Sequence, residues 1–204
     1  MTIRKGEPWG EPAEVPAEGL ESPDTDRGAS RSLELQRQAG RAFPPIGVQG
    51  GDMARTMGGG TPGRINGTLV KAPVDLLQVT ADGAEHLALA HVVVRRSWWR
   101  GEVVLAMNAQ FLGVYDVAPR SHPNDGRVDV LRVDAAMPVR ARLQARARAR
   151  TGTHLPHPHL EVRSTGEWHH RFARPMRLWI DGARIGEVRD LTITVLPDAL
   201  TLYA

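Results

Sequence analysis

The stretch that decides the fold covers residues 98–133 and reads WWRGEVVLAMNAQFLGVYDVAPRSHPNDGRVDVLRV. Within it, Val103 to Met107 is an unbroken apolar run of strand-favouring residues, too short for an independent helix. Because this run is apolar on both faces, it predicts a central strand of a sheet. Residues 111–117 predict a partner strand, joined to it by a tight link or a bulge over residues 108–110. Val128 to Val133 predicts a further strand of the same sheet.

A turn separates the last two of these strands. Pro119 ends the strand before it, because proline has no N–H to donate to a ladder. His122 to Gly126 (HPNDG) then combines residues that favour turns. Asn and Asp tolerate the left-handed backbone region, and Gly adopts positive φ without strain. The sequence therefore predicts that the chain reverses here between two strands.

The strand pattern extends outward in both directions. Residues 69–80 and 87–94 predict strands on the N-terminal side. On the C-terminal side, apolar residues alternate with polar ones over residues 176–181 and 191–195, and Asp181-Gly182 is a hairpin signal between them. Many short strands joined by Gly- and Pro-containing turns predict a mainly β protein, built as a two-layer β-sandwich with one or two short helices.

Five motifs, taken in order, resemble the C-terminal domain of the diacylglycerol kinase and sphingosine kinase-like lipid kinase superfamily. They are Asn108 at a strand end, Ala118-Pro119 with the following turn at Asp125-Gly126 and Asp129, Gly152-Thr153-His154, Asp181-Gly182, and the closing strands of residues 191–202. The resemblance covers the chain from about Val74 to Ala204. It implies a β-sandwich, a diacylglycerol-type or other lipid substrate, and ATP-dependent phosphoryl transfer to an alcohol group.

A glycine-rich segment before these motifs resembles another part of the same kinases. Residues 47–60 (GVQGGDMARTMGGG) are similar to the family motif Gly-Thr-Gly-Asn-Asp-Phe-Ala-Arg. A glycine-rich turn that leads into a helix can bind phosphate through backbone N–H groups. The residues that the resemblance places in such a nucleotide or phosphate site are Gly50, Gly51, Asp52 and Arg55. The alternative is a flexible loop and a short helix over residues 52–57.

Two departures from the family bear on catalysis. The sequence lacks the motif Gly-Gly-Asp-Gly-Thr, whose backbone binds ATP phosphates in these kinases, so ATP binding is expected to be degenerate. The late Asp-Gly-Glu of the family, whose acidic side chain accepts a proton, reads Asp181-Gly182-Ala183 here, which leaves Asp181 as the candidate catalytic residue. Phosphoryl transfer depends more on positioned phosphates and metal than on one base, so the missing nucleotide cradle is the graver departure.

The resemblance also implies a structural Mg²⁺ at the turn. Asp125 would hold the ion through its carboxylate, with help from the backbone carbonyls of His122 and Arg127. Oxygen ligands of this kind suit magnesium. The alternative is a plain Asn-Asp-Gly turn.

The histidines are weaker candidates for metal ligands. His91 lies inside the apolar residues 87–94, where a hydrogen-bonded core residue is commoner than a ligand. His154, His157 and His159 are close in sequence, but the intervening prolines splay the backbone and no cysteine or carboxylate completes the set. A stand-alone metal-dependent enzyme that uses these histidines is therefore only a minor hypothesis for function, beside the two that are given at the end of this subsection.

Two segments are candidates for lipid contact. In residues 95–101 (RRSWWRG), Trp98 and Trp99 could form a lip on phosphate headgroups, because tryptophan favours membrane interfaces. Alternatively, the tryptophans cover the end of the sheet.

The second segment, residues 138–150 (PVRARLQARARAR), predicts a helix that begins with proline. Arg142 and Arg146 lie one turn apart on one face, and Val139 and Leu143 form a narrow apolar stripe that would anchor the helix. The arginine face could lie on anionic lipid or bind nucleic acid without sequence preference. The alternative is a solvated helix with one anchored edge.

Composition limits the class of protein. The 204 residues include 26 basic and 23 acidic side chains, for a net charge of +3, and every basic residue except Lys5 and Lys71 is arginine. There is no cysteine, which excludes disulfides and thiolate metal sites. The sequence shows neither a signal-peptide pattern nor the ~20 consecutive apolar residues of a membrane span. We therefore expect a cytoplasmic protein, with peripheral association at the inner face of the membrane left open.

The chain divides into three parts by composition. Residues 1–42 are rich in Pro, Gly and Glu and predict a mostly disordered arm. Within the arm, Trp9 could dock on the body or lie in a floppy tail, and residues 30–39 predict a short helix. Residues 43–65 form the glycine-rich remnant of the nucleotide-domain motif, and residues 66–204 form the β-sandwich.

Two hypotheses for function follow. The first is a lipid-kinase-like protein that binds a lipid substrate and has lost most of its ATP site. The alternative is a noncatalytic module that docks on a membrane or a partner. A lipid or membrane surface is the expected partner and nucleic acid is not, while a homo-oligomer or a partner chain that supplies the nucleotide site stays open.

Overall fold

Most of the protein is one sheet of ten strands, counted within residues 9–14, 20–58 and 69–204, which the computed structural model describes. In spatial order the sheet contains β1 (Glu11–Ala13), β3 (Leu69–Ala81), β12 (Ala183–Tyr203), β11 (Glu167–Ile180), β5 (His91–Arg95), β6 (Val103–Met107), β9 (Val128–Val133) and β10 (Leu160–Thr165). These neighbours are antiparallel. The ninth and tenth strands are β4 (Ala84–Ala88), antiparallel to β3, and β2 (Ile46–Gly47), parallel to β12.

The sheet folds into two layers that pack face to face. The long strands β11 and β12 take part in both layers. The first part of β11 pairs with β12 where β12 also pairs with β3, and the last part of β11 pairs with β5. A register shift between Arg171 and Met176 separates the two parts. The core between the layers draws side chains from seven strands of the sheet, among them the fully buried Val94, Val104 and Ile193.

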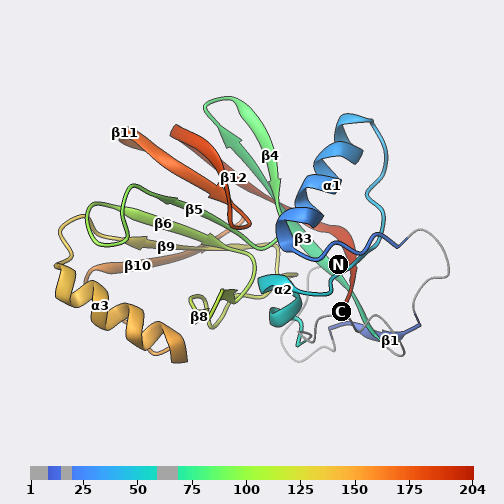
Figure 1. Cartoon of the computed structure of the whole chain (residues 1–204), viewed down its shortest axis with the longest axis horizontal. Coiled ribbons are helices and arrows are strands. Elements are labelled where there is room, and N and C mark those ends of the chain that lie inside the picture. The colour runs from blue at the N-terminus through green and yellow to red at the C-terminus, as the bar shows by residue number, and fades with distance from the viewer. Residues whose placement is uncertain (1–8, 15–19, 59–68) are drawn as a thin grey trace.

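Three α-helices lie within the described residues, at two ends of the sheet (Figure 1). Helices α1 (Asp26–Gln38) and α2 (Gly51–Thr56) enclose a second apolar cluster with β3, β4 and the end of β12. Helix α3 (Val139–Arg148), which continues into a 3₁₀ turn over Ala149–Thr151, lies beside β9 and β10 at the other end (Figure 1). A separate hairpin of β7 (Phe111–Leu112) and β8 (Tyr115–Asp116) lies between the two ends.

The predicted fold class is confirmed. The apolar run from Val103 to Met107 is a central strand with every residue buried, and residues 128–133 form its neighbour. Asp181-Gly182 forms the expected hairpin, and Asp181 adopts the left-handed conformation at φ 47°. The helix expected after Pro138 is present.

The single strand expected over residues 87–94 is wrong. The chain forms β4 and β5 instead, with a bend at Leu89 and Ala90 between them. The N–H groups of residues 89–91 donate to the carboxylate of Asp181, and the carbonyls of Leu89 and Ala90 accept hydrogen bonds from Asn108. Side chains that are distant in sequence therefore replace the ladder bonds that would continue the strand.

The partner strand expected over residues 111–117 is also wrong. The strands that pair with β6 are β5 and β9, and residues 111–116 fold back on themselves as the β7–β8 hairpin. Gly113 permits this reversal because it adopts a φ of 58°.

The described portion of the arm expected over residues 1–42 includes the short helix expected over residues 30–39. This helix is α1, which begins earlier, at Asp26, and its start is capped by the side chain of Thr25. Trp9 docks on the body: its indole N–H donates to the carbonyl of Pro73 at 3.2 Å and its ring packs edge-on to His122. Residues 1–8, 15–19 and part of the glycine-rich segment, residues 59–68, lie outside the described residues.

Candidate functional site

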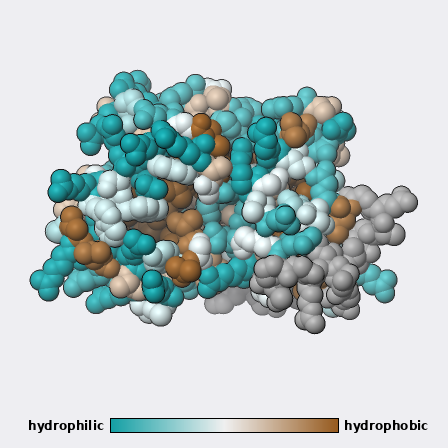
Figure 2. Space-filling view, in the orientation of Figure 1, coloured by the Kyte–Doolittle hydropathy of each residue, from teal (hydrophilic) through white to brown (hydrophobic). Residues whose placement is uncertain are grey.

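A cavity of about 450 Å³ lies between α3, the β7–β8 hairpin and the outer face of β5, β6 and β9. Its floor is apolar, with Val93, Leu105 and Leu131 as the strand residues beneath the helix. Figure 2 shows this place as a recess in which hydrophobic residues are visible among hydrophilic ones. A cavity of this size and lining is typical of small-molecule sites in proteins.

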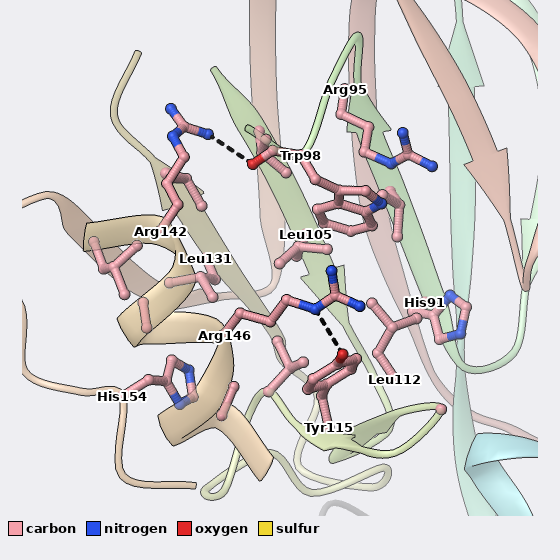
Figure 3. A pocket seen from close by; sticks show the side chains of 18 of the residues that line it. His91, Arg95, Trp98, Leu105, Leu112, Tyr115, Leu131, Arg142, Arg146 and His154 are labelled. Carbon is pink, nitrogen blue, oxygen red and sulfur yellow. Dashed lines mark hydrogen bonds between the residues drawn. The ribbon is translucent and has the colours of Figure 1, made fainter. Parts of the chain in front are cut away.

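Arginines and aromatic rings form the rim of the cavity. The guanidinium of Arg95 lies over the rings of Trp98 and Trp179, at 4.4 and 4.1 Å from their centroids. Across the cavity, Nε–H of Arg146 donates to the hydroxyl of Tyr115 at 2.6 Å (Figure 3). This hydrogen bond, together with the nearby positive charge, lowers the pKa of Tyr115. We call Arg95, Trp98, Trp99, Tyr115, Arg146 and Trp179 the arginine–aromatic rim.

Helix α3 presents the opposite face to the sheet from the one expected. Arg142 is only 4% exposed, whereas Val139 and Leu143 are 44% and 51% exposed. The guanidinium of Arg142 donates to four backbone carbonyls, those of Met137, Trp98, Gly101 and Asp134. Because all of these bonds fix the protein itself, Arg142 does not offer its charge to a lipid, and the predicted arginine contact with lipid retains only Arg146.

A second constellation adjoins the cavity at His91, which lines it. Nε2 of His91 is 3.0 Å from a carboxylate oxygen of Asp52, whose other oxygen accepts a hydrogen bond from the N–H of Gly113. The carboxylate of Asp26 accepts from the N–H groups of Asp52 and Met53. We call Asp26, Asp52, His91 and Asp181 the acidic cluster.

Burial and mutual repulsion dominate the electrostatics of the acidic cluster. Burial, reinforced by the charge of Asp181, raises the pKa of Asp26 to about 7. Burial by itself lowers the pKa of His91, but the hydrogen bond to Asp52 and the surrounding carboxylates together raise it above its ordinary value. Asp26 and His91 therefore favour their protonated forms more than ordinary Asp and His do.

The structure uses the expected phosphate-binding residues for other purposes. Gly50, Gly51 and Asp52 do lead into a helix, α2, but its first N–H groups are occupied by Asp26. Gly51 is required there, because a Cβ would meet the carboxylate of Asp26 at 2.5 Å. Arg55 stacks on Phe111 and donates to the carbonyl of Gly113. A phosphate site at these residues stays a prediction.

The predicted catalytic residue Asp181 is buried and is tied to the backbone. Its carboxylate accepts three N–H bonds, at 2.9, 2.9 and 3.0 Å, from residues 89–91. This set of contacts gives it a clear role in joining two turns of the sheet. Its catalytic role stays a prediction.

The turn expected to hold Mg²⁺ is acidic. Asp125 accepts a hydrogen bond from the N–H of Arg127, and burial, reinforced by the charges of Asp129 and Asp75, raises its pKa to about 6. Nδ1 of His122 accepts from Asn124. Carboxylate and carbonyl oxygens on one turn suit a divalent cation, and a magnesium site at Asp125 with the carbonyls of His122 and Arg127 stays a prediction.

The histidine-rich segment does not form a metal centre. Among the described residues, no group of three or more His, Cys, Asp or Glu side chains is placed to hold a metal ion. His154 is buried and lines the cavity, while His157 and His159 have their rings 5.8 Å apart near the surface. Burial lowers the pKa of His154, which favours a neutral imidazole.

Sequence reasoning missed Asp26, Tyr115 and Trp179 as site residues, and it included Arg95 only as part of the segment over residues 95–101. Tyr115 and Trp179 had been assigned to ordinary strands, and Asp26 to a disordered arm. The alternation of Met176, Leu178 and Ile180 gave the one usable signal, because it places Trp179 on the face opposite the core.

The chain belongs to the family of the YegS C-terminal NAD kinase beta sandwich-like domain, whose model matches residues 72–204. This match confirms the resemblance found in the sequence. A comparison with curated proteins gave no match.

Solved structures agree on the fold. The chain is similar to a diacylglycerol kinase from Bacillus anthracis str. Sterne, with 14% identity and a TM-score of 0.61 over 90% of this chain and 75% of that one. It is also similar to a protein of the same organism proposed to be a diacylglycerol kinase, with 13% identity and a TM-score of 0.65 over 90% of this chain and 77% of that one. Within the described residues, no helix has the length and apolar character needed to cross a membrane.

Asp26 gives a testable dependence of stability on pH. Its pKa in the folded protein, about 7, lies above its ordinary value of 3.8, so the folded state binds an extra proton between these values. The free energy of unfolding should therefore fall as pH rises through this window, by about 4 kcal/mol from this group. Asp26→Asn should flatten that slope, as measured by urea unfolding at a series of pH values.

The matched control is Asp24→Asn, which changes an exposed carboxylate two residues earlier. It should leave the slope of the wild-type protein unchanged. Equal slopes for the wild-type protein and Asp26→Asn would contradict the assignment.

Proposed function

We propose that this chain is a lipid-kinase-like protein that binds the acyl part of a lipid in the cavity under α3. The single observation that supports this most is the cavity itself, which is apolar on its floor and cationic and aromatic at its rim. An acyl chain would bury apolar surface against the floor, which gives about 25 cal/mol for each Å² removed from water. The polar end of the lipid would stay at the rim.

Binding to the cavity should respond to its volume. Ala145 lines the cavity from α3, and Ala145→Phe should fill part of it and weaken binding of an acyl lipid about tenfold or more. Ala147→Phe on the exposed face of the same helix is the control and should change affinity little. Trp98, Trp99 and Trp179 line the cavity, so their fluorescence can report the titration.

Equal affinities of the two variants and the wild-type protein would place the lipid elsewhere. Thermal unfolding of each variant separates this result from a folding defect, because a filled cavity should not lower stability by much.

We further propose that phosphoryl transfer is degenerate in this chain. The amides at the start of α2 are already bonded to Asp26, and Ala183 stands where the resembling kinases have glutamate. If the protein were active, it would transfer a phosphoryl group from ATP to a lipid alcohol, with Mg²⁺ supplied as the nucleotide complex and Asp181 as the candidate catalytic residue. A bound Mg²⁺ at Asp125 would hold the turn together and take no part in that step.

An assay with Mg-ATP and diacylglycerol tests this point. We expect no phosphatidate above the background without protein, and no shift of the melting temperature on addition of ATP. Robust phosphatidate formation would show that the nucleotide site is functional.

An alternative is a noncatalytic module that docks on a membrane through the outer face of α3. Val139 and Leu143 are exposed on that face, and Val162 on β10 is 48% exposed. Figure 2 shows hydrophobic residues on the outer surface in the region that α3 occupies in Figure 1. Exposed apolar residues flanked by arginine are typical of surfaces that contact lipid.

Liposome flotation distinguishes the alternative. If α3 docks, the wild-type protein should bind liposomes that contain anionic lipid, and Leu143→Asp should reduce the bound fraction severalfold. Leu35→Asp, at an equally exposed leucine on α1, is the control and should have no effect. No binding of the wild-type protein would remove the membrane version.

A further inference from the structure

The cavity contains a cation that the described residues leave without a counter-charge. Arg95 lines the cavity, and neither an ion pair nor a hydrogen bond satisfies its guanidinium within residues 9–14, 20–58 and 69–204. Burial lowers the pKa of Arg95, and the charge of Arg177, which lies directly opposite on β11, lowers it further. Like charges opposite each other in a sheet are destabilising, so this pair would be stabilised by an anion.

Unsatisfied polar atoms gather at the same place. Six buried side-chain nitrogen or oxygen atoms lack a hydrogen-bond partner among the described residues, and four of them belong to Arg95, His91 and His154. All three residues line the cavity. Buried polar groups in folded proteins are nearly always hydrogen-bonded. The Nε–H of Arg95 is a donor only and is itself buried, so the terminal N–H groups of the guanidinium are the ones that a ligand in the cavity could reach.

The charge of the lining is one-sided. Arg95, Arg142 and Arg146 line the cavity and no Asp or Glu does so in the described residues. The guanidinium of Arg142 already donates to four backbone carbonyls, so Arg95 and Arg146 are the arginines of the lining that can bind a ligand. Arg95 is held by two indoles and Arg146 by Tyr115, so both guanidinium groups are oriented before a ligand binds. Such groups favour carboxylate and phosphate.

The volume limits the number of chains. The cavity volume of about 450 Å³ lies within the range of small-molecule sites in proteins, and one long acyl chain would occupy it. We expect the second chain of a diacylglycerol to extend beyond the cavity into water, which disfavours a two-chain ligand.

We propose that the cavity binds a single-chain anionic amphiphile, with its headgroup between Arg95 and Arg146 and its chain over Leu105 and Leu131. This inference rests on the proposed function, namely that a lipid occupies the cavity, and it changes the ligand from a neutral two-chain lipid to a charged one-chain lipid. The headgroup chemistry is a carboxylate or a phosphate monoester, either of which accepts hydrogen bonds from arginine. The aromatic rings of the rim shield these bonds from water, which strengthens them.

Fluorescence titrations of the full chain with four probes test the proposal. The probes are hexadecanoate, lysophosphatidate with one hexadecanoyl chain, the neutral hexadecanoylglycerol, and neutral dihexadecanoylglycerol, each below its aggregation concentration. We expect at least one of the two anions to bind about tenfold or more tightly than either neutral probe. The tighter anion identifies the headgroup.

Variants assign the preference to the two arginines. Arg95→Gln and Arg146→Gln should each weaken binding of the anion about tenfold and leave the affinity for hexadecanoylglycerol unchanged. Their controls are Arg96→Gln, at the exposed neighbour of Arg95, and Arg148→Gln, on the exposed part of α3, and both should retain the preference. If Arg95→Gln fails to fold because its stacking is lost, Arg146→Gln still carries the test.

The outcomes separate the two proposals. Binding of neutral and anionic single-chain probes with equal affinity would overturn the charged ligand and leave the lipid cavity intact. A preference for the anion that survives in Arg146→Gln would overturn the placement of the headgroup between Arg95 and Arg146. Tightest binding of dihexadecanoylglycerol would overturn the single-chain limit. Binding of none of the four probes would overturn the proposed function itself.

Discussion

The hydrogen bonds of one buried arginine set the position of α3, and the cavity depends on that position. Arg142 reaches from the helix to the carbonyls of Trp98 and Gly101 on one side and of Met137 and Asp134 on the other. Hydrogen bonds from a charged donor to buried carbonyls are among the stronger ones in proteins. They hold the helix against the β5–β6 loop, while the smaller Ala145 and Ala149 face the sheet and leave space beneath. The tryptophans of that loop thereby become part of the rim.

At the other end of the molecule, side chains also form hydrogen bonds in place of backbone ladder bonds, and these bonds join distant segments. Asp181 binds three successive amides, Asn108 binds the carbonyls of Asp75 and Leu89, and Asp26 binds the start of α2. These contacts link segments that are up to 92 residues apart in sequence. They also explain why carboxylates gather around His91.

The sequence allowed the strands with regular patterns to be predicted, and it failed where distant partners decide the backbone. The run from Val103 to Met107 and the alternation around Leu178 needed only local information. The bend at Leu89 could not be found, because no Gly or Pro marks it and its cause is Asp181.

The residues of the candidate site could likewise be predicted only where local sequence was sufficient. Trp98, Trp99 and Arg146 were identified from their local sequence, and they do lie at one rim. Arg142 was placed on the wrong face, because an arginine side chain is expected in water unless its partners are known. The four carbonyls that justify its burial belong to two loops outside the helix. Tyr115 and Arg95 gain their importance only from the residues they meet in space.

The passage of β11 and β12 through both layers has a consequence for how the molecule comes apart. Both layers contain parts of β11 and β12, so neither layer can separate without breaking hydrogen bonds that the other layer also depends on. The two layers are therefore expected to unfold together. The strands that form the floor of the cavity under α3 should stay folded until the whole sheet unfolds.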